Sequence, residues 1–454
     1  MDLLREPQQL SVARFPRLAP AGLIKTRKAF GLWTVVQGYD RLLARLGKRP
    51  GALVDDGTAP ERDLDANVVA VGYDFRLGVA EAAETLDREL RPRLAHLWPD
   101  EKDRRRRVVV IAHSMGGLVA RYWVSVLGGA PWCRGIITLG TPHRGAPKAL
   151  EVMANGVPVG PFHITRPVEV IRQWQGLADL LPRYRAITDP GSDDAVRTAT
   201  AGPSFRRDVL LRPHELPLAW LREPAARAHA MHREIEAGWQ GLDVPPALMP
   251  RIGFGHATLR FCSWNGAEVT VTKEVPSGPE LGGWAADLGD GTVPMYCGLP
   301  VEMDNYPRIH LRAHRRHGPI AELDETEALL DAFRADPVLS AYRANQESLI
   351  GLGLDLDELH LRDRPIPIAA TPVTLTGDRV HAGQAAVWAI AEALGVDAPP
   401  PVEARLEWDG DAGQFRGELP GLPPGLAKVT VKAQDLTDSP ATQVVQVLDD
   451  VSVE

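Results

Sequence analysis

The sequence predicts an α/β fold in which a doubly wound, mostly parallel β-sheet carries helices on both faces. Two observations predict it. An unbroken apolar run at Val108–Ala112 is followed by a sharp turn and a helical stretch over residues 117–127. Similar runs at residues 67–73 and 135–140 flank this unit, and a helical segment at residues 79–97 precedes it. Such β-branched runs are typical of strands that are buried on both faces of a parallel sheet.

Composition bounds the classes of protein that the chain can belong to. Its 454 residues are enough for two or three domains, and 44% hydrophobic with 24% charged residues is ordinary for a soluble globular protein. The 51 basic and 59 acidic side chains give a formal charge of -8, whereas a bulk nucleic-acid binder carries the opposite sign. We therefore expect no nucleic-acid partner.

The cysteines and the N-terminus suggest a location. Three cysteines are too few for a disulfide framework and fit a reducing compartment. No apolar run approaches the roughly 18 residues that a membrane span needs. The first residues contain no apolar core for export. The sequence as written is therefore expected to be cytoplasmic.

The middle of the chain differs in texture from the predicted sheet. Residues 149–250 are rich in proline and glycine, and they contain isolated helical patches at 168–181 and 225–239 with no convincing strand. A segment of this kind inside an α/β core is typical of an inserted helical cap. Trp174 and Trp239 are suited either to a lipid-facing lid or to packing between cap and core.

After the cap, strands are expected at 257–264 and 268–275, and helices at 325–334 and 383–394.

The end of the chain predicts a separate β module. Asp397–Pro401 is typical of a stiff linker. Three runs after it alternate like strands, and turn-rich segments separate them; the runs are 402–408, 427–433 and 441–448. We expect a small, immunoglobulin-like β-sandwich.

Four parts are therefore predicted. They are a first core segment (1–148), a cap (149–250), a second core segment (251–396) and a C-terminal β module (397–454).

The turn after the central strand carries the first chemical motif. Residues 112–117 read Ala-His-Ser-Met-Gly-Gly. An α/β-hydrolase holds its serine on a strained turn so that the hydroxyl stands clear of the sheet, and the residues around it must be small, which explains the two glycines. Ala112 stands where glycine is usual. We predict Ser114 as the nucleophile and the Met115 amide as an oxyanion donor, with a helix-capping role for Ser114 as the alternative.

A serine near its free pKa needs a base, and the base needs an orienting acid, in the chain order serine, acid, histidine. Asp290 follows a predicted strand and has glycine on either side, so it is the predicted acid. Asp287 is a weaker competitor. A purely structural turn aspartate is the alternative interpretation of Asp290.

Three histidines compete for the role of the base. His310, His314 and His317 follow Asp290, and His317 leads into Gly-Pro and a helix, which is the context expected of the base. Their i, i+4, i+7 spacing also allows a metal site, but no cysteine or carboxylate pattern supports one. We predict His317 as the base, and neither a metal nor a cofactor.

Seven motifs then occur in a fixed order across residues 20–335. They are Gly38–Asp40, Tyr73–Arg76, His113–Arg121, Thr138–Gly145, Leu180–Tyr184, Gly289–Pro294 and His317–Gly318. In these motifs the chain resembles the lecithin:cholesterol acyltransferase family, which includes phospholipid:diacylglycerol acyltransferases and bacterial lipase-like relatives. The resemblance implies an α/β-hydrolase fold, with Ser114, Asp290 and His317 as nucleophile, acid and base. It also implies a lid after Gly145, over an acyl pocket, and it does not cover the C-terminal module.

One family feature has no match. The family carries an oxyanion-loop glycine motif on a strand ahead of the segment that corresponds to Tyr73–Arg76, and Trp33–Gly38 is only a partial substitute because the resemblance places Gly38 at a helix start. Loss of one oxyanion donor typically costs about 10²–10³ in turnover. Three explanations are open: a start upstream of Met1, which could restore an export signal; another segment that supplies the amide; or reduced activity.

The sequence thus predicts a serine-dependent lipid O-acyltransferase or lipase that acts on glycerolipid esters through an acyl-enzyme. Two alternatives remain: a catalytically impaired hydrolase-fold binding protein and a small-ester carboxylesterase. The expected partners are a lipid or ester substrate and, through the cap, a transient contact with a membrane surface. The sequence names no protein partner for the C-terminal module.

Overall fold

The computed structural model describes residues 6–19, 23, 39–59, 61–159, 162–188, 210–273, 289–303, 312–322, 325–334, 350–374, 379–394, 398–434, 436–437 and 440–449. Trp33–Gly38, Asp287 and His310 from the sequence predictions lie outside these residues.

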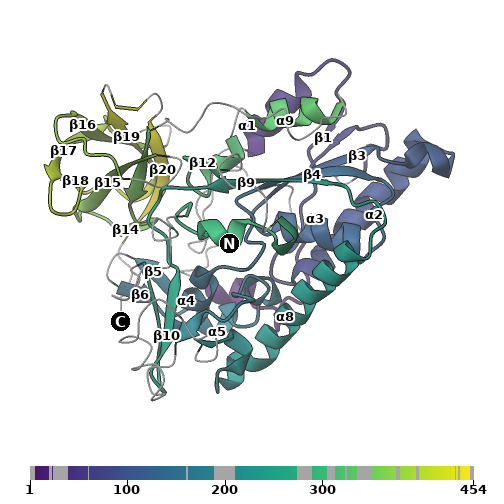
Figure 1. Cartoon of the computed structure of the whole chain (residues 1–454), viewed down its shortest axis with the longest axis horizontal. Helices are drawn as coiled ribbons and strands as arrows, with labels where there is room; N and C mark the ends of the chain where they lie inside the picture. Colours follow the sequence, from purple (N-terminus) through teal and green to yellow (C-terminus); the bar gives the residue numbers. More distant parts are fainter. Residues whose placement is uncertain are drawn as a thin grey trace.

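A parallel sheet lies at the centre of the molecule. Its hydrogen-bonded order is β12-β9-β4-β3, and the strands span Arg312–Ala313, Ala247–Gly253, Cys133–Leu139 and Val108–His113. Helices cover both faces (Figure 1). One face carries α1 (Tyr39–Gly47) and α9 (Glu325–Arg334), and the other carries α2 (Val79–Leu97), α3 (Gly116–Ser125) and α8 (Ala219–Gln240). The predicted α/β architecture is confirmed at this level.

Several predicted elements are present. The helices expected at 79–97, 117–127 and 325–334 correspond to α2, α3 and α9. The run at 67–73 contains only a two-residue strand, β2 (Val68–Val69), which pairs in parallel with β1 (Val54–Asp55) in a sheet of its own. Within the described residues β3 therefore forms an edge of the central sheet, with β2 not hydrogen-bonded to it.

The prediction for residues 149–250 missed a central strand. β9 begins at Ala247 and pairs in parallel with β4, so the predicted boundary at 250 falls inside a strand. Proline cannot donate to a strand ladder, and Pro250 in this run therefore argued against a strand at the sequence level. The structure places Pro250 opposite Thr138 in the parallel ladder and buries it.

The inserted segment is a mixture of helices and short strands. Its helices are α4 (Pro147–Asn155), α5 (Val168–Ile171), α6 (Gln175–Ala178) and α8. Its short strands are β5 (Val157–Val159), β6 (Phe162–Ile164), β7 (Ile187–Thr188) and β8 (Leu210–Leu211), and the last two join β10 (Phe261–Trp264) and β11 (Val269–Thr272). Trp174 and Trp239 are buried in the same hydrophobic core as Trp123 of α3. Packing, not lipid contact, is therefore what these two tryptophans do in this structure.

The C-terminal region is larger than predicted. Eight strands form one sheet in the order β13-β15-β18-β17-β16-β19-β20-β14, at the upper left of Figure 1. They span Ile350–Asp355 (β13), Leu359–Leu361 (β14), Ile366–Thr374 (β15), Val387–Ala393 (β16), Val402–Asp409 (β17), Gln414–Leu419 (β18), Gly425–Ala433 (β19) and Ala441–Leu448 (β20). The three predicted strands are confirmed as β17, β19 and β20. The boundary predicted at 397 falls between β16 and β17, which pair antiparallel.

The helix predicted at 383–394 is wrong, because this segment contains β16. Its alanines favoured a helix, but burial alternates along it: Val387, Ala389 and Ala391 are buried, whereas Trp388 is exposed. A period of two is the pattern of a strand with one buried face. The buried positions pack in one hydrophobic core with side chains of β13, β15 and β17–β20.

No helix in the described ranges is both long enough and apolar enough to cross a membrane.

Candidate active site

Ser114 lies in the turn between β3 and α3. Its backbone φ of +52° is in the left-handed region, which a residue with a side chain adopts at a cost, and such strain is concentrated at functional sites. A Cβ at Gly117 would overlap Thr141 Oγ1, so only glycine fits there. Gly116 has ordinary spacing to its neighbours, 3.6 Å or more, so crowding explains only the second glycine of the motif.

The structure brings Ser114, His317 and Asp290 together. The Ser114 Oγ is 2.9 Å from His317 Nε2, and His317 Nδ1 is 2.7 Å from Asp290 Oδ2. An ionised carboxylate only accepts, so Nδ1 carries the proton and Nε2 is free to accept from the serine hydroxyl. Ser114 makes no side-chain cap to α3, which contradicts the alternative that it serves as a helix cap.

Asp290 uses its two carboxylate oxygens differently. Its Oδ1 accepts from the amides of Thr292 at 2.9 Å and Val293 at 2.7 Å, while Oδ2 faces His317. The Thr258 hydroxyl accepts from the amides of Gly289 and Gly291, on either side of the aspartate. Asp290 is therefore a turn aspartate and the partner of the imidazole at once, so the two interpretations of it are compatible.

His113 supports the same imidazole from the other side. Its Nε2 is 2.7 Å from the His317 carbonyl, which only accepts, so Nε2 carries the proton and donates. Its Nδ1 then accepts from the Tyr39 hydroxyl, also at 2.7 Å. Burial, together with any charge on His317, lowers the pKa of His113 to about 3, which keeps this ring neutral. Sequence reasoning missed this role, although His113 directly precedes the serine in the motif.

The other candidates for the acid and the base were Asp287, His310 and His314. Asp287 and His310 lie outside the described residues. His314 is largely buried beside Phe254, with ring centroids 5.9 Å apart, and it also packs against Gly351. Burial lowers the pKa of His314 to about 4. Among the described residues, no cluster of three or more histidine, cysteine, aspartate or glutamate side chains is arranged to hold a metal ion.

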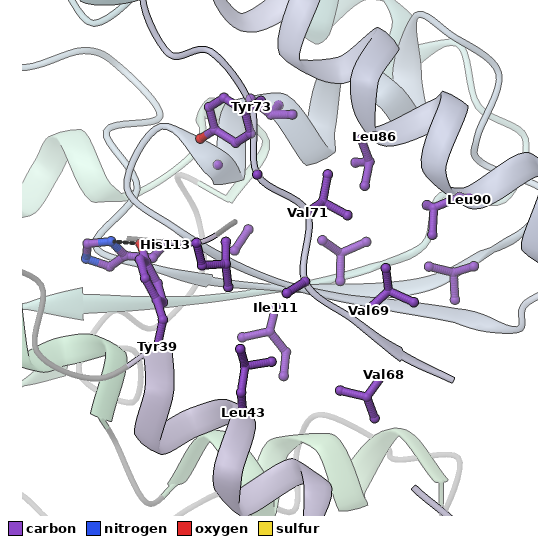
Figure 2. A pocket seen from close by; sticks show the side chains of 18 of the residues that line it. Tyr39, Leu43, Val68, Val69, Val71, Tyr73, Leu86, Leu90, Ile111 and His113 are labelled. Carbon is purple, nitrogen blue, oxygen red and sulfur yellow. Dashed lines mark hydrogen bonds between the residues drawn. The ribbon is translucent and has the colours of Figure 1, made fainter. Parts of the chain in front are cut away.

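A cavity of about 1040 Å³ reaches Ser114 and His317. Figure 2 shows its polar end, where Tyr39, Tyr73 and His113 lie. Away from this end much of the wall is aliphatic and comes from α1, residues 67–73 around β2 (the β2 segment), α2 and β3; it includes Leu43, Val69, Val71, Leu86, Leu90 and Ile111. Arginine side chains line it as well, namely Arg49, Arg93, Arg106, Arg107 and Arg134. The cavity runs between the edge of β3 and the β2 segment, where the central sheet has no further strand among the described residues.

Tyr73 lies beside the serine turn. Its hydroxyl is 3.6 Å from the position that a Cβ would take at Gly116, and none of the described residues forms a hydrogen bond with it. Burial raises the pKa of Tyr73, so the group stays protonated and can donate. No described residue accepts from the Met115 amide at the same turn. Two unused donors therefore lie near Ser114.

A lecithin:cholesterol acyltransferase family model matches residues 60–178. Over this segment the chain is similar to that family. The match confirms the resemblance noted from the motifs, and it includes Ser114 and Met115. It ends before Asp290 and His317, whose place in the site rests on geometry alone.

No curated protein matches the chain. Solved structures with some likeness include a Tle4–Tli4 complex, at 15% identity over 64% of this chain and 73% of that chain, with a TM-score of 0.41. Phospholipase PlaB from Legionella pneumophila is 13% identical over 89% and 84%, with a TM-score of 0.24. A CARDB domain of the PF1109 protein from Pyrococcus furiosus is 7% identical over 24% and 99%, with a TM-score of 0.15. All three TM-scores are below 0.5, so these likenesses carry no argument.

Gly140 makes room for the pair formed by Asp290 and His317. Its φ is +59°, and a Cβ there would lie 3.0 Å from Asp290 Oδ2 and 3.1 Å from His317 Nδ1. The residue belongs to the motif Thr138–Gly145, but nothing in the sequence alone indicated this contact. A side chain here would press directly on the hydrogen bond between the two groups.

We predict that Gly140→Ala lowers turnover at least tenfold while the protein remains folded. The added methyl displaces the carboxylate from the imidazole, and the positive φ adds backbone strain of about 1 kcal/mol. Steady-state kinetics with an activated ester, alongside a thermal unfolding curve, measures both effects. Gly128→Ala is a matched control, because Gly128 also has positive φ but open space around it. Equal turnover in the two variants would contradict the steric role of Gly140.

Proposed function

We propose that this protein is a serine-dependent lipid hydrolase or O-acyltransferase that acts on glycerolipid esters through an acyl-enzyme. The observation that carries the proposal is the hydrogen-bonded series Ser114 Oγ, His317 Nε2, Nδ1 and Asp290 Oδ2, which lies at one end of a large, mostly aliphatic cavity. The family match over residues 60–178 supports acyl chemistry on lipids.

The proposed reaction uses each group once in each half. His317 Nε2 takes the hydroxyl proton as Ser114 Oγ attacks the ester carbonyl, and Asp290 stabilises the imidazolium that forms. The tetrahedral intermediate then expels the alcohol, which receives the proton from Nε2, and an acyl-serine remains. Water or an acceptor alcohol next gives its proton to Nε2 and attacks the acyl-serine. The second tetrahedral intermediate then breaks its bond to Ser114 Oγ, which takes the proton back from Nε2, and the acid or a new ester is released.

The developing oxyanion needs two donors. We assign the first to the Met115 amide, which lies next to the serine and is unused within the described part of the chain. We assign the second to the Tyr73 hydroxyl, because it is protonated, unpartnered among the described residues and close to Gly116 at the same turn. This assignment offers a donor in place of the glycine motif that the sequence lacks.

The cavity favours a long acyl chain over a small ester. Apolar groups gain free energy in proportion to the area that they remove from water, and the aliphatic walls offer such burial along the length of the cavity. Hydrolysis and acyl transfer share the same groups, so the cavity supports the class of acyl donor and leaves the acceptor open.

We predict that a fluorophosphonate probe labels the wild-type protein and that Ser114→Ala abolishes labelling and ester turnover. The probe forms a covalent bond only with a serine that is activated by a base. Ser125→Ala is the matched control, since Ser125 lies on α3 with its hydroxyl bonded to the Arg121 carbonyl. Absence of labelling in the wild type would support the alternative of a hydrolase-fold binding protein.

The predicted dependence on acyl length separates a lipid enzyme from a small-ester carboxylesterase. We expect kcat/KM on nitrophenyl esters to rise from butyrate to dodecanoate, by up to about fourfold per methylene, because a buried methylene gains about 0.8 kcal/mol. Val71→Trp should remove the rise by filling the cavity while butyrate turnover persists. Val244→Trp, at an exposed position, should leave the rise intact. A profile in the wild type that is flat or falls with length would favour the carboxylesterase.

We predict that Tyr73→Phe lowers kcat by about 10²-fold with little change in KM, as expected for a hydrogen bond made only in the transition state. Tyr122→Phe is the control, because the Tyr122 hydroxyl contacts Glu234 on α8, away from the serine turn. A kcat for Tyr73→Phe within twofold of the wild type would rule out Tyr73 as a donor to the oxyanion.

A further inference from the structure

The C-terminal sheet contacts both loops that carry the acid and the base. The connection between β13 and β14, together with the end of β13, forms a segment of residues 353–358 that we call the β13–β14 segment. It lies against Arg316, which precedes His317, and against His256, which pairs with the loop that holds Asp290. The C-terminal sheet, through a part that the sequence assigned to the second core segment, is therefore in direct contact with the candidate site.

Arg316 provides the contact on the side of the base. Its guanidinium is buried, and it donates to the Leu354 carbonyl from Nη1 at 3.2 Å and to the Leu356 carbonyl from Nη2 at 3.0 Å. The same group packs against the residue after the acid, since a Cβ at Gly291 would lie 2.8 Å from Nη2. One side chain thus touches the β13–β14 segment and the loop of Asp290 while its backbone leads into His317.

His256 provides the contact on the side of the acid. Its Nδ1 accepts from the Leu354 amide at 2.9 Å, and burial, reinforced by the charge of Arg316, lowers the pKa of His256 so that the ring is neutral. Its backbone exchanges two hydrogen bonds with Gly289, of 2.9 and 3.0 Å. Because Gly289 directly precedes Asp290, the position of Leu354 is transmitted to the acid through His256 and Gly289.

The buried charge of Arg316 is costly in this setting. Among the described residues, its hydrogen-bond acceptors are the two backbone carbonyls and no carboxylate. Carbonyl dipoles only partly replace water around a cation, and a neutral side chain would fill the same space at a lower desolvation cost. Glu358 lies nearby and bonds to Lys148 at 2.8 Å, and it raises the pKa of Arg316 against the effect of burial. Packing alone does not explain an arginine here.

We propose that the β13–β14 segment is part of the catalytic apparatus and that Arg316 is the positioning residue through which it orients His317. This inference rests on the proposed function of Ser114, His317 and Asp290. The arginine fixes the loop of the base against Leu354 and Leu356, and in this way it holds the backbone that leads into His317.

Arg316→Gln and Arg316→Lys test this role. For Arg316→Gln we expect kcat to fall about 10²-fold with KM within threefold, because the base loses its alignment with Ser114 while the cavity for the substrate is unchanged. Arg316→Lys keeps the charge but not the paired donation to two carbonyls. Its kcat should therefore fall about tenfold, again with KM within threefold.

Lys273→Gln is the matched control. Lys273 bonds to Asp355 at 2.6 Å and to Asp357 at 3.4 Å, so the variant removes a cation from the same segment without touching Arg316. We expect its kcat and its KM to equal those of the wild type. A fall in kcat in this variant as large as in Arg316→Gln would mean that the effect is general charge loss, and it would overturn the role of Arg316.

Thermal unfolding and fluorophosphonate labelling distinguish the remaining outcomes. If Arg316→Gln loses activity only in proportion to its unfolded fraction, Arg316 is structural and the proposal is overturned. If Arg316→Gln does not fold, Arg316→Lys decides: kcat within twofold of the wild type rejects positioning, and a tenfold loss with a folded protein supports it. Absence of labelling in the wild type overturns the proposed function itself, whereas normal wild-type labelling with an equally fast Arg316→Gln overturns this inference alone.

Discussion

The hydrogen bond between His317 Nδ1 and Asp290 Oδ2 is the interaction on which the rest of the site depends. Both groups are almost completely buried, so neither is solvated by bulk water, and each must be satisfied by the protein. The surrounding backbone is shaped to allow this. A Cβ at Gly140 would press on the bond itself, and one at Gly253 would overlap Asp290. The pair is therefore enclosed by two glycines from neighbouring parallel strands: Gly140 directly follows β4, and Gly253 is the last residue of β9.

The imidazole is held from three directions by groups that differ in kind. Asp290 fixes the tautomer through Nδ1, the neutral ring of His113 fixes the backbone carbonyl, and Arg316 fixes the preceding residue to the C-terminal sheet. In this arrangement His317 Nε2 lies 2.9 Å from the Oγ of Ser114, whose backbone is strained. A preorganised base of this kind needs little rearrangement during proton transfer. The strain at Ser114 and the buried cation at Arg316 are the two costs of that preorganisation.

Local sequence predicted the parts of this site that local chemistry determines. A turn of small residues after an apolar run predicted Ser114, and a carboxylate between two glycines predicted Asp290. Each of these patterns lies within six consecutive residues, so it can be recognised without knowledge of the fold. Supporting groups were missed where the contact joins distant segments. Gly140 and Gly253 look like ordinary glycines until the acid is placed beside them. No local motif marks Arg316, since its acceptors, the carbonyls of Leu354 and Leu356, lie on and just after a strand that begins at Ile350.

The errors in the fold have the same origin. Pro250 weakened the signal of β9, although neighbours on both sides hold that strand in the sheet. The alanines of β16 favoured a helix by propensity, and the alternating burial that makes them a strand arises only when β17 and β19 pack beside them. Tertiary pairing decided both segments against local preference.

The edge of β3 connects the fold to the chemistry. Among the described residues one edge of β3 has no partner strand, and the β2 segment, α1 and α2 line the cavity beside it. On the proposed function, an acyl chain would enter beside Ser114 and run along β3 into the body of the protein. The inserted segment, with Trp174 and Trp239 in the core, then has no need to supply the apolar surface for that chain. The cavity beside β3 would then determine which length of acyl chain is accepted, and the C-terminal strands would hold the base in its orientation.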